Sequence, residues 1–288
     1  MKKDKVVRTK AHLSDTITEL EVKNRKVALK AAREAIVLLE NDGVLPLAGK
    51  SKIAMFGEGV TNTVKGGGGS GEVNERKSTS VYEGMLEAGF QITSAAIIED
   101  YAKTASEHRK DFFEEQQKKA GLLNFSVTMA NMKKPYVSPA FPALKEEQLD
   151  TETDTCIYII SRICSESYDR QLEPGDYYLS ETELHNIRLC AAHYTKLILV
   201  INAGGPIDLC ALDDIYISAN INMSMLGSAG GTAFAEVVSG KVSPSGKLSS
   251  TWPVHYEDFP YAKEYSYLND NTVQEYYKHR DLSRRLRD

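Results

Sequence analysis

An uninterrupted apolar run that leads directly into a charged loop and then a helix start is the feature that most constrains this chain. The run, Cys156–Ile160, is rich in β-branched residues and carries no charge, as in a strand of a parallel sheet that is buried on both faces. Ser180, with Glu183 three residues later, has the pattern of a capping box that starts a helix. Open α/β sheets present functional groups in this arrangement, at the carboxyl ends of their strands. We therefore expect any chemistry of the chain in this stretch, residues 155–184.

Similar strand and helix patterns alternate along most of the chain. Apolar residues at helical spacing predict helices over 23–41, 80–88, 97–120, 181–193 and 232–239. Short β-branched runs predict strands over 52–56, 90–94, 156–160, 196–202, 215–225 and 247–252. Such alternation predicts an α/β fold: a layered α/β sandwich with a mostly parallel central sheet flanked by helices.

The domain organisation follows from changes in this pattern. We expect a polar N-terminal arm over 1–22, the sandwich domain over 23–270 and a polar tail over 271–288. Within the domain, residues 98–150 begin as a highly charged helix and continue as a proline-containing segment without periodicity. We interpret this segment as an excursion from the core sheet that serves as a lid or a docking surface.

Composition excludes several classes of function. The net charge of −5 and the isoelectric point near 5.8 argue against a nucleic-acid partner. No apolar run approaches the ~18 residues of a membrane span, and the N-terminus lacks the apolar segment of a signal peptide. The histidines are scattered, and the cysteines show no metal-ligand spacing, so we expect reduced thiols, a cytoplasmic location, no metal and no cofactor. The cysteines are Cys156, Cys164, Cys190 and Cys210.

A glycine-rich loop, Gly66–Gly71, allows two interpretations. Its backbone can pack closely or adopt positive φ, or it can approach a phosphate. It lacks the Gly-Lys-Ser/Thr ending of a P-loop and the spacing of a dinucleotide fingerprint, and Glu72 and Glu75 would repel a phosphate. We favour backbone packing and keep phosphate binding as the second alternative.

Four stretches, in order, resemble the α/β sandwich domain of glycoside hydrolase family 3, which comprises β-glucosidases, xylosidases and related exo-acting enzymes. They are AREAIVLLENDGVLPL (32–47), KGGGGSGEVN (65–74), LILVINAGGPIDL (197–209) and SGKVSPSGKLSSTWP (239–253). Each motif alone is weak, but together they cover roughly residues 25–270. The resemblance implies hydrolysis of terminal glycosidic bonds in β-glucosides or related carbohydrates.

The resemblance also assigns residues. In SESYDR, Glu166 stands where the family has its catalytic acid/base, although Ser167 replaces a frequent glycine. Spacing alone favours another interpretation, in which Glu166 is a surface carboxylate and Asp169 pairs with Arg170. The family's Gly-Gln-Glu-Gly-Gly segment appears here without its Glu, at Gly227–Gly231. Residues implied to bind substrate or support the loops are Asp169, Arg170, Gly67, Gly68 and Ser70.

The family's nucleophile, an Asp, lies on a separate (β/α)8-like barrel domain, and we find no Ser-Asp-Trp-type segment for it in this chain; the only Trp is Trp252. The sequence therefore resembles the front part of a family member with inverted domain order, and a truncated gene, a split gene or an excised domain would look like this. We expect a barrel partner, in cis or in trans.

Two alternatives remain open at this point. The chain can be a non-catalytic carbohydrate-associated or docking module that is inactive alone. A nucleotide-binding α/β protein is the weaker alternative, because only the glycine-rich loop supports it.

Overall fold

The computed structural model describes residues 16–68, 71–73, 75–120, 136–164, 170–259 and 262. Its centre is one six-stranded sheet with strand order β1-β6-β5-β4-β2-β3, in which β1 is antiparallel to β6 and all other pairs are parallel. The strands are β1 Val37–Asn41, β2 Lys52–Phe56, β3 Gln91–Ile92, β4 Thr155–Arg162, β5 Lys196–Ala203 and β6 Ala219–Asn222. The predicted α/β sandwich with a mostly parallel sheet is confirmed.

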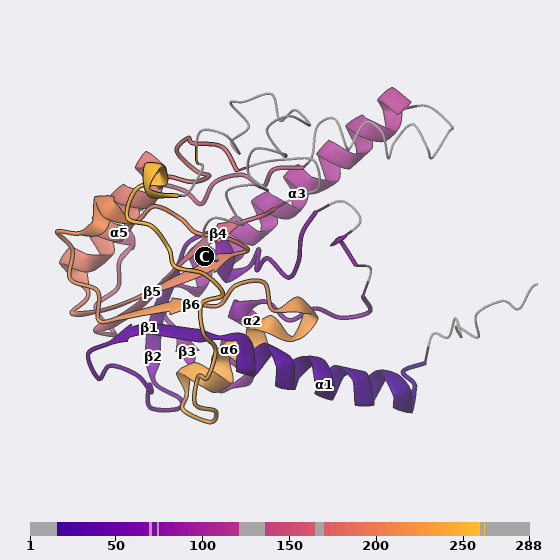
Figure 1. The fold of residues 1–288 in the computed structure, drawn as a ribbon, viewed down its shortest axis with the longest axis horizontal. Helices are drawn as coiled ribbons and strands as arrows, with labels where there is room; N and C mark the ends of the chain where they lie inside the picture. The colour runs from indigo at the N-terminus through magenta and orange to yellow at the C-terminus, as the bar shows by residue number, and fades with distance from the viewer. Residues whose placement is uncertain are drawn as a thin grey trace, which may run out of the picture.

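Helices cover both faces of the sheet (Figure 1). Successive side chains of a strand point to opposite faces, so Ile157 and Ile159 of β4 join one core cluster and Tyr158 and Ile160 join the other. The first cluster includes residues of α1, α2 and α6, and the second includes residues of α3 and α5. The helices are α1 Glu19–Ala35, α2 Val81–Glu87, α3 Ala95–Ala120, α5 Glu181–His193 and α6 Gly230–Val238.

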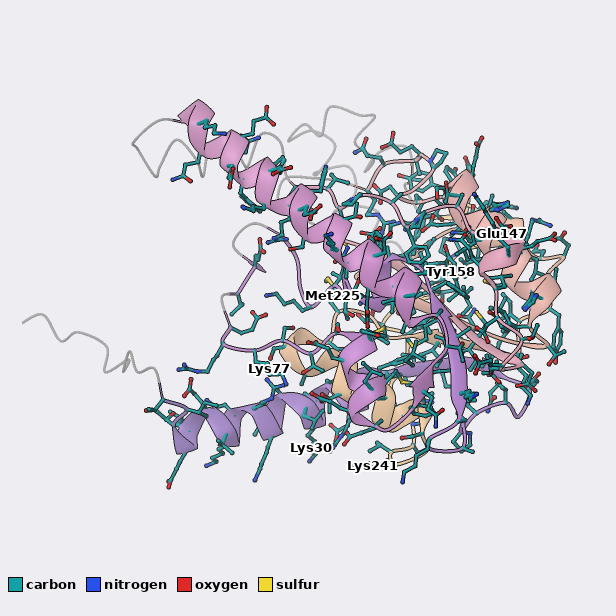
Figure 2. The ribbon with its side chains drawn as sticks, turned by 180° about the vertical axis from the view of Figure 1, so that it is seen from behind. Lys30, Lys77, Glu147, Tyr158, Met225 and Lys241 are labelled. Carbon is teal, nitrogen blue, oxygen red and sulfur yellow. The ribbon has the colours of Figure 1, made fainter. Side chains whose placement is uncertain are left out.

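Strand β4 is buried along its whole length, as the unbroken apolar run predicts. Figure 2 shows Tyr158 among the packed side chains of the interior, whereas Lys30, Lys77 and Lys241 project from the surface. Tyr158 is only 1% exposed. The candidate site thus follows a strand that is closely packed along its whole length.

Capping boxes start three of the helices. Thr18, Ser80 and Ser180 each accept a hydrogen bond from the backbone of the third helical residue, whose Glu side chain bonds back to the cap. The predicted starts of the second and fourth helices are therefore confirmed. Helix α1 begins at Glu19, inside the segment interpreted as an N-terminal arm.

The prediction of one helix over 23–41 is wrong at its C-terminal end. The helix stops at Ala35, Ile36 is extended, and Val37–Asn41 forms β1, which pairs with β6. The β-branched and apolar residues that looked like a helix face instead fill an edge position of the sheet, and the partner strand lies far away in the sequence. Gly43, at φ +106°, belongs to the turn after β1.

Two other strand predictions also need correction. The strand expected over 215–225 is only the four residues of β6. No strand forms over 247–252. Just before this stretch, the Gly246 N–H donates to the Ile36 carbonyl at 3.0 Å, as a single contact and not as part of a strand ladder.

The segment 98–150 contributes more to the core than an excursion would. Tyr101 and Ala105 of α3 are buried in the second core cluster, together with Phe141, Leu144 and Leu149. The far end of α3, in contrast, extends away from the sheet (Figure 1). None of the helices in the described part of the chain is both long and apolar enough to cross a bilayer.

Candidate functional site

Strands β2, β4 and β5 are parallel neighbours, so their carboxyl ends meet at one edge of the sheet. The loops that leave these three strands contain nearly all the residues that the sequence singles out. Glu166, Asp169 and Ser70 lie outside the described residues, whereas Arg170, Gly67 and Gly68 are described. The site is therefore built here from the residues that frame the loop of Glu166.

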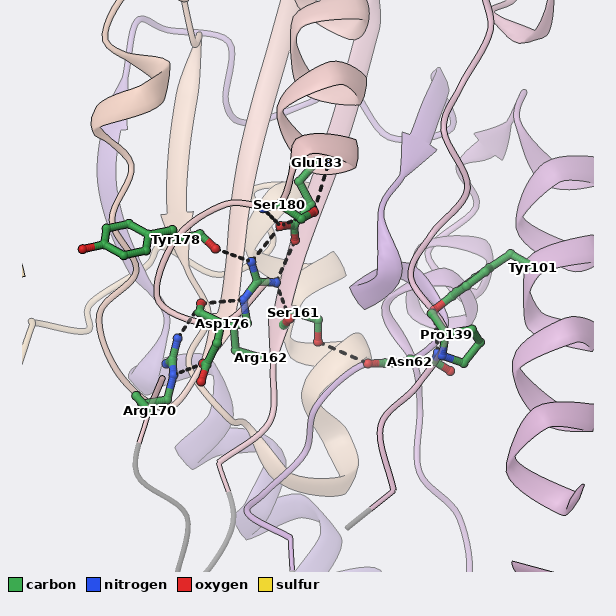
Figure 3. A network of polar contacts seen from close by, with 10 residues as sticks. All are labelled: Asn62, Tyr101, Pro139, Ser161, Arg162, Arg170, Asp176, Tyr178, Ser180 and Glu183. Carbon is green, nitrogen blue, oxygen red and sulfur yellow. Dashed lines mark hydrogen bonds and ion pairs between the residues drawn. The ribbon is translucent and has the colours of Figure 1, made fainter. Parts of the chain in front are cut away.

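Arg162, the last residue of β4, is the centre of a buried polar network (Figure 3). Its guanidinium, 6% exposed, donates to both carboxylate oxygens of Glu183 at 2.7 Å and to the carbonyl oxygens of Ser161 and Asp176 at 2.8 Å. Glu183 in turn accepts hydrogen bonds from the backbone N–H and hydroxyl of Ser180, at 2.8 and 3.0 Å. The buried Arg162 and the half-buried Glu183 thus each have several partners, the condition under which an ion pair withdrawn from water is tolerated.

Asp176 joins this network to the other end of the candidate loop. Its carboxylate pairs with Arg170 and accepts the Gln171 N–H at 2.6 Å, and its carbonyl accepts from Arg170 at 2.7 Å as well as from Arg162. The chain therefore enters the Glu166 segment at one arginine and leaves it at another, and both arginines are bonded to Asp176 (Figure 3). Among the described residues, the partner of Arg170 is Asp176; the alternative pairing with Asp169 stays untested.

The glycine-rich loop lies against the entry to the same segment. The Gly68 N–H donates to the Cys164 carbonyl at 2.7 Å, and a Cβ added at Gly67 would lie 3.1 Å from that oxygen. Close backbone approach, the interpretation favoured from the sequence, therefore describes these two glycines. Their neighbour Lys65 forms an ion pair with Glu75 at 2.6 Å. The positive charge that would attract a phosphate to this loop is therefore neutralised.

Asn202 is a site residue that sequence reasoning missed. Fully buried near the end of β5, it accepts the Val64 N–H at 2.6 Å and donates to the carbonyls of Val64 and Ser224 at 2.9 and 2.5 Å. It thereby ties the start of the glycine-rich loop to the sheet. The sequence could have indicated it, because Asn202 is a polar amide at the end of the apolar run KLILVIN.

Glu58 is a second missed residue. It lies two residues after the end of β2, and desolvation by burial raises the pKa of its carboxyl to about 7, with Arg162 opposing this rise and Glu183 adding to it. The backbone beside it packs tightly against β4, since a Cβ at Gly57 would lie 2.3 Å from the Ile159 carbonyl oxygen. Its position after a parallel strand could have marked it.

A hydrogen-bonded chain extends the network toward α3. The Asn62 amide donates to the Tyr101 hydroxyl at 2.9 Å, and that hydroxyl donates to the Pro139 carbonyl at 2.9 Å (Figure 3). The Ser161 hydroxyl of β4 donates to the Asn62 carbonyl at 3.4 Å, so β4, the loop after β2 and the segment after α3 are linked by hydrogen bonds.

Gly230 and Gly231, in the segment that replaces the Glu-containing family motif, have a packing role. A Cβ at Gly231 would lie 1.8 Å from the Ser80 carbonyl oxygen, and one at Gly84 would lie 2.1 Å from that of Gly231. Helices α2 and α6 therefore meet backbone to backbone, which only glycine permits.

Taken together, these contacts define an α/β sandwich domain with an anchored, charged loop and a glycine-rich loop at the carboxyl edge of its sheet. The sequence model of the glycosyl hydrolase family 3 C-terminal domain matches residues 36–281. The chain belongs to this family, as its C-terminal domain, and the resemblance noted in the sequence is confirmed.

Relatives and solved structures agree with this assignment. β-Glucosidase A from Butyrivibrio fibrisolvens is 31% identical over 265 residues, which is 83% of this chain and 30% of that protein. The β-glucosidase from Ruminococcus albus is 30% identical over 239 residues, 83% of this chain and 24% of that protein. β-Glucosidase 3B from Thermotoga neapolitana, solved with glucose, superimposes with a TM-score of 0.69 at 33% identity, covering 83% of this chain and 32% of its own. This chain therefore spans about a third or less of each.

Proposed function

We propose that this chain is the sandwich domain of a retaining β-glucosidase-like enzyme and supplies Glu166 as the acid/base of the active site. In this proposal a (β/α)8 barrel domain, in cis or in trans, supplies the nucleophile and most contacts to the sugar. The substrates are terminal β-glucosides or related carbohydrates. The cytoplasmic location stays a prediction from cysteine usage.

Family membership carries the proposal, and the geometry around Arg162 supports it. Retaining hydrolysis needs two carboxyl groups about 5–5.5 Å apart, one a nucleophile and the other an acid that later acts as a base. A carboxyl group supplied by one domain to a partner domain must be presented reproducibly, because small displacements of a catalytic group lower the rate strongly. The two arginines bonded to Asp176 fix both ends of the segment that contains Glu166.

The acid must also hold its proton near neutral pH. Both described arginines near the segment are already paired, Arg162 with Glu183 and Arg170 with Asp176. A cation without a partner would lower the pKa of a neighbouring carboxyl group. The pairing of both arginines is therefore compatible with a protonated Glu166.

An activity assay tests the proposal. We expect little or no hydrolysis of aryl β-glucoside or β-xyloside by the chain alone, because a lone acid lacks the nucleophile and the sugar-binding contacts. A mixture with a separately expressed family barrel domain should turn over substrate. In that mixture Glu166→Gln should lower kcat by about 10²–10⁴-fold, with a larger loss for alkyl than for nitrophenyl leaving groups, because the acid protonates the leaving oxygen.

Glu173→Gln is the matched control, since Glu173 is an exposed carboxylate in the same stretch, and it should leave the rate unchanged. Turnover by the chain alone that disappears in Glu166→Gln would contradict the need for a barrel. No activity in any mixture would favour the alternative, a non-catalytic carbohydrate-associated or docking module.

A further inference from the structure

A mixed cluster of metal-ligating side chains lies apart from the Glu166 loop. Asp208 and Cys210 belong to the loop after β5, and His255 belongs to the closing segment, residues 239–259. One potential ligand atom from each of the three lies within 4.8 Å of the other two. The sequence showed no metal-ligand spacing here, because Asp208 and Cys210 are separated from His255 by a long stretch of chain.

The donor set selects the type of ion. Thiolate, imidazole and carboxylate together suit a borderline-soft cation such as Zn²⁺, whereas Mg²⁺ and Ca²⁺ prefer sites made of oxygen atoms alone. Three protein ligands leave a fourth tetrahedral position for water. The Val254 carbonyl oxygen, 3.2 Å from the Cys210 sulfur, is a further oxygen beside the site.

The loop after β5 holds two of the ligands in place. Asp208 accepts the Cys210 N–H at 2.9 Å with one carboxylate oxygen, and its own N–H donates to the Tyr177 carbonyl at 2.9 Å. The buried Tyr177 ring meets the Tyr256 ring edge to face, with centroids 5.5 Å apart, and so packs the closing segment against this loop. Two ligands are thus fixed before an ion arrives, and the third comes from a segment already docked beside them.

We propose that Asp208, Cys210 and His255 bind a Zn²⁺ ion that fastens the closing segment to the loop after β5. Ligands of tetrahedral zinc lie about 3.5 Å apart, and the three donors already lie within 4.8 Å of one another, so a small rotation of the exposed His255 side chain can complete the site. Burial and the Asp208 carboxylate raise the pKa of the Cys210 thiol, so the ion displaces the thiol proton when it binds.

The ion would connect two parts of the molecule. The closing segment runs from the side of α6 to the side of α5 (yellow in Figure 1). Asp208 is bonded to Tyr177, the neighbour of Asp176, to which Arg162 and Arg170 bind. Zinc would therefore hold the closing segment next to the anchor of the charged loop. This step concerns folding of this chain and does not depend on the proposed hydrolysis.

Metal titration of the purified full-length chain tests the proposal. After chelator treatment, we expect one equivalent of Zn²⁺ to bind, and Co²⁺ in its place to give a thiolate charge-transfer absorption band. Cys210→Ser, Asp208→Asn and His255→Gln should each weaken binding at least tenfold, and Cys210→Ser should abolish the band. Zinc should also raise the melting temperature of the wild type but not of the variants.

Cys164→Ser and His108→Gln remove a thiol and an imidazole outside the cluster and should change nothing. His255 is exposed, so His255→Gln should fold even if a substitution at Cys210 does not. Absence of zinc uptake, uptake unchanged in His255→Gln, or a cobalt complex without the thiolate band would each overturn the proposal.

Discussion

Two polar clusters follow neighbouring strands of the sheet, and they differ in how their charges are satisfied. Around Arg162, after β4, the two described arginines each have an acidic partner: Glu183 for Arg162 and Asp176 for Arg170. Around Cys210, after β5, three groups that can act as ligands face one another, and Asp208 forms no ion pair with another described residue. The first cluster joins residues of one stretch, between Ser161 and Glu183, whereas the second joins two segments that are distant in the sequence.

The difference separates two ways in which a cluster of polar groups can stabilise a fold. A cluster whose charges balance internally gains stability and needs nothing from outside, although desolvation limits what it contributes. In the proposed zinc site the ligands gain a cation only when the ion binds, so the stability that this cluster contributes depends on the ion concentration. Substitutions in the first cluster should therefore lower the free energy of unfolding under all conditions. Substitutions in the second cluster should lower it only when metal is present.

Arg162→Met should give the largest effect. It leaves the carboxylate of Glu183, whose side chain is 16% exposed, buried without its partner. We expect a loss of about 3–5 kcal/mol in the free energy of unfolding, measured by urea denaturation. The double substitution Arg162→Met with Glu183→Gln should recover much of this loss, because no unpaired charge remains.

Arg188→Met is the matched control for this pair. Arg188 and Asp214 form a bidentate pair of similar length, but their side chains are 49% and 64% exposed. Screening by water limits such a pair to about 1 kcal/mol or less. Equal losses in Arg162→Met and Arg188→Met would mean that the Arg162 cluster is not a buried anchor.

Glu58→Gln should have the next largest effect, and one that depends on pH. The folded chain raises the pKa of this carboxyl to about 7, above its value in the unfolded chain, so the folded state holds the proton more tightly. The resulting stability is complete below the unfolded pKa and is lost as the pH rises through about 7. A shift of this size corresponds to at most about 3 kcal/mol.

The variant lacks this titrating group. Its free energy of unfolding, relative to that of the wild type, should therefore increase as the pH rises from 4.5 to 8. Urea denaturation at several pH values measures the difference, and the exposed Glu173→Gln should show none. A constant difference between Glu58→Gln and the wild type across this range would show that Glu58 titrates normally.

Local signals in the sequence predicted much of the fold. Runs such as Lys52–Phe56 and Lys196–Asn202 carry enough β-branched and apolar residues to specify buried strands without knowledge of their partners. The capping box at Ser180 sets the start of α5 through bonds that span only three residues. These elements are specified by residues that lie close together in the sequence.

The predictions from the sequence were wrong where the structure of a segment depends on pairing with a strand far along the chain. Residues 36–41 became a strand because β6, far along the chain, offers a free edge. Residues 247–252 have the composition of a strand but pair with no strand of the described sheet. Within the site, the loop between Arg162 and Arg170 was apparent from its charge pattern, whereas its anchor at Asp176 required the folded chain. Asn202 and Glu58 were missed because both act through contacts across the sheet edge that only the folded chain brings together.

The smallest expected effect separates the two clusters most clearly. In metal-free buffer, His255→Gln removes an exposed side chain that belongs to no buried ion pair of the described structure. We expect the free energy of unfolding to change by at most about 0.5 kcal/mol, measured by urea denaturation with chelator present. A loss as large as that of Arg162→Met under these conditions would mean that His255 already stabilises the closing segment without an ion. Both clusters would then stabilise the fold without an ion. The distinction between a cluster whose charges pair with one another and a cluster that needs Zn²⁺ would not hold for this protein.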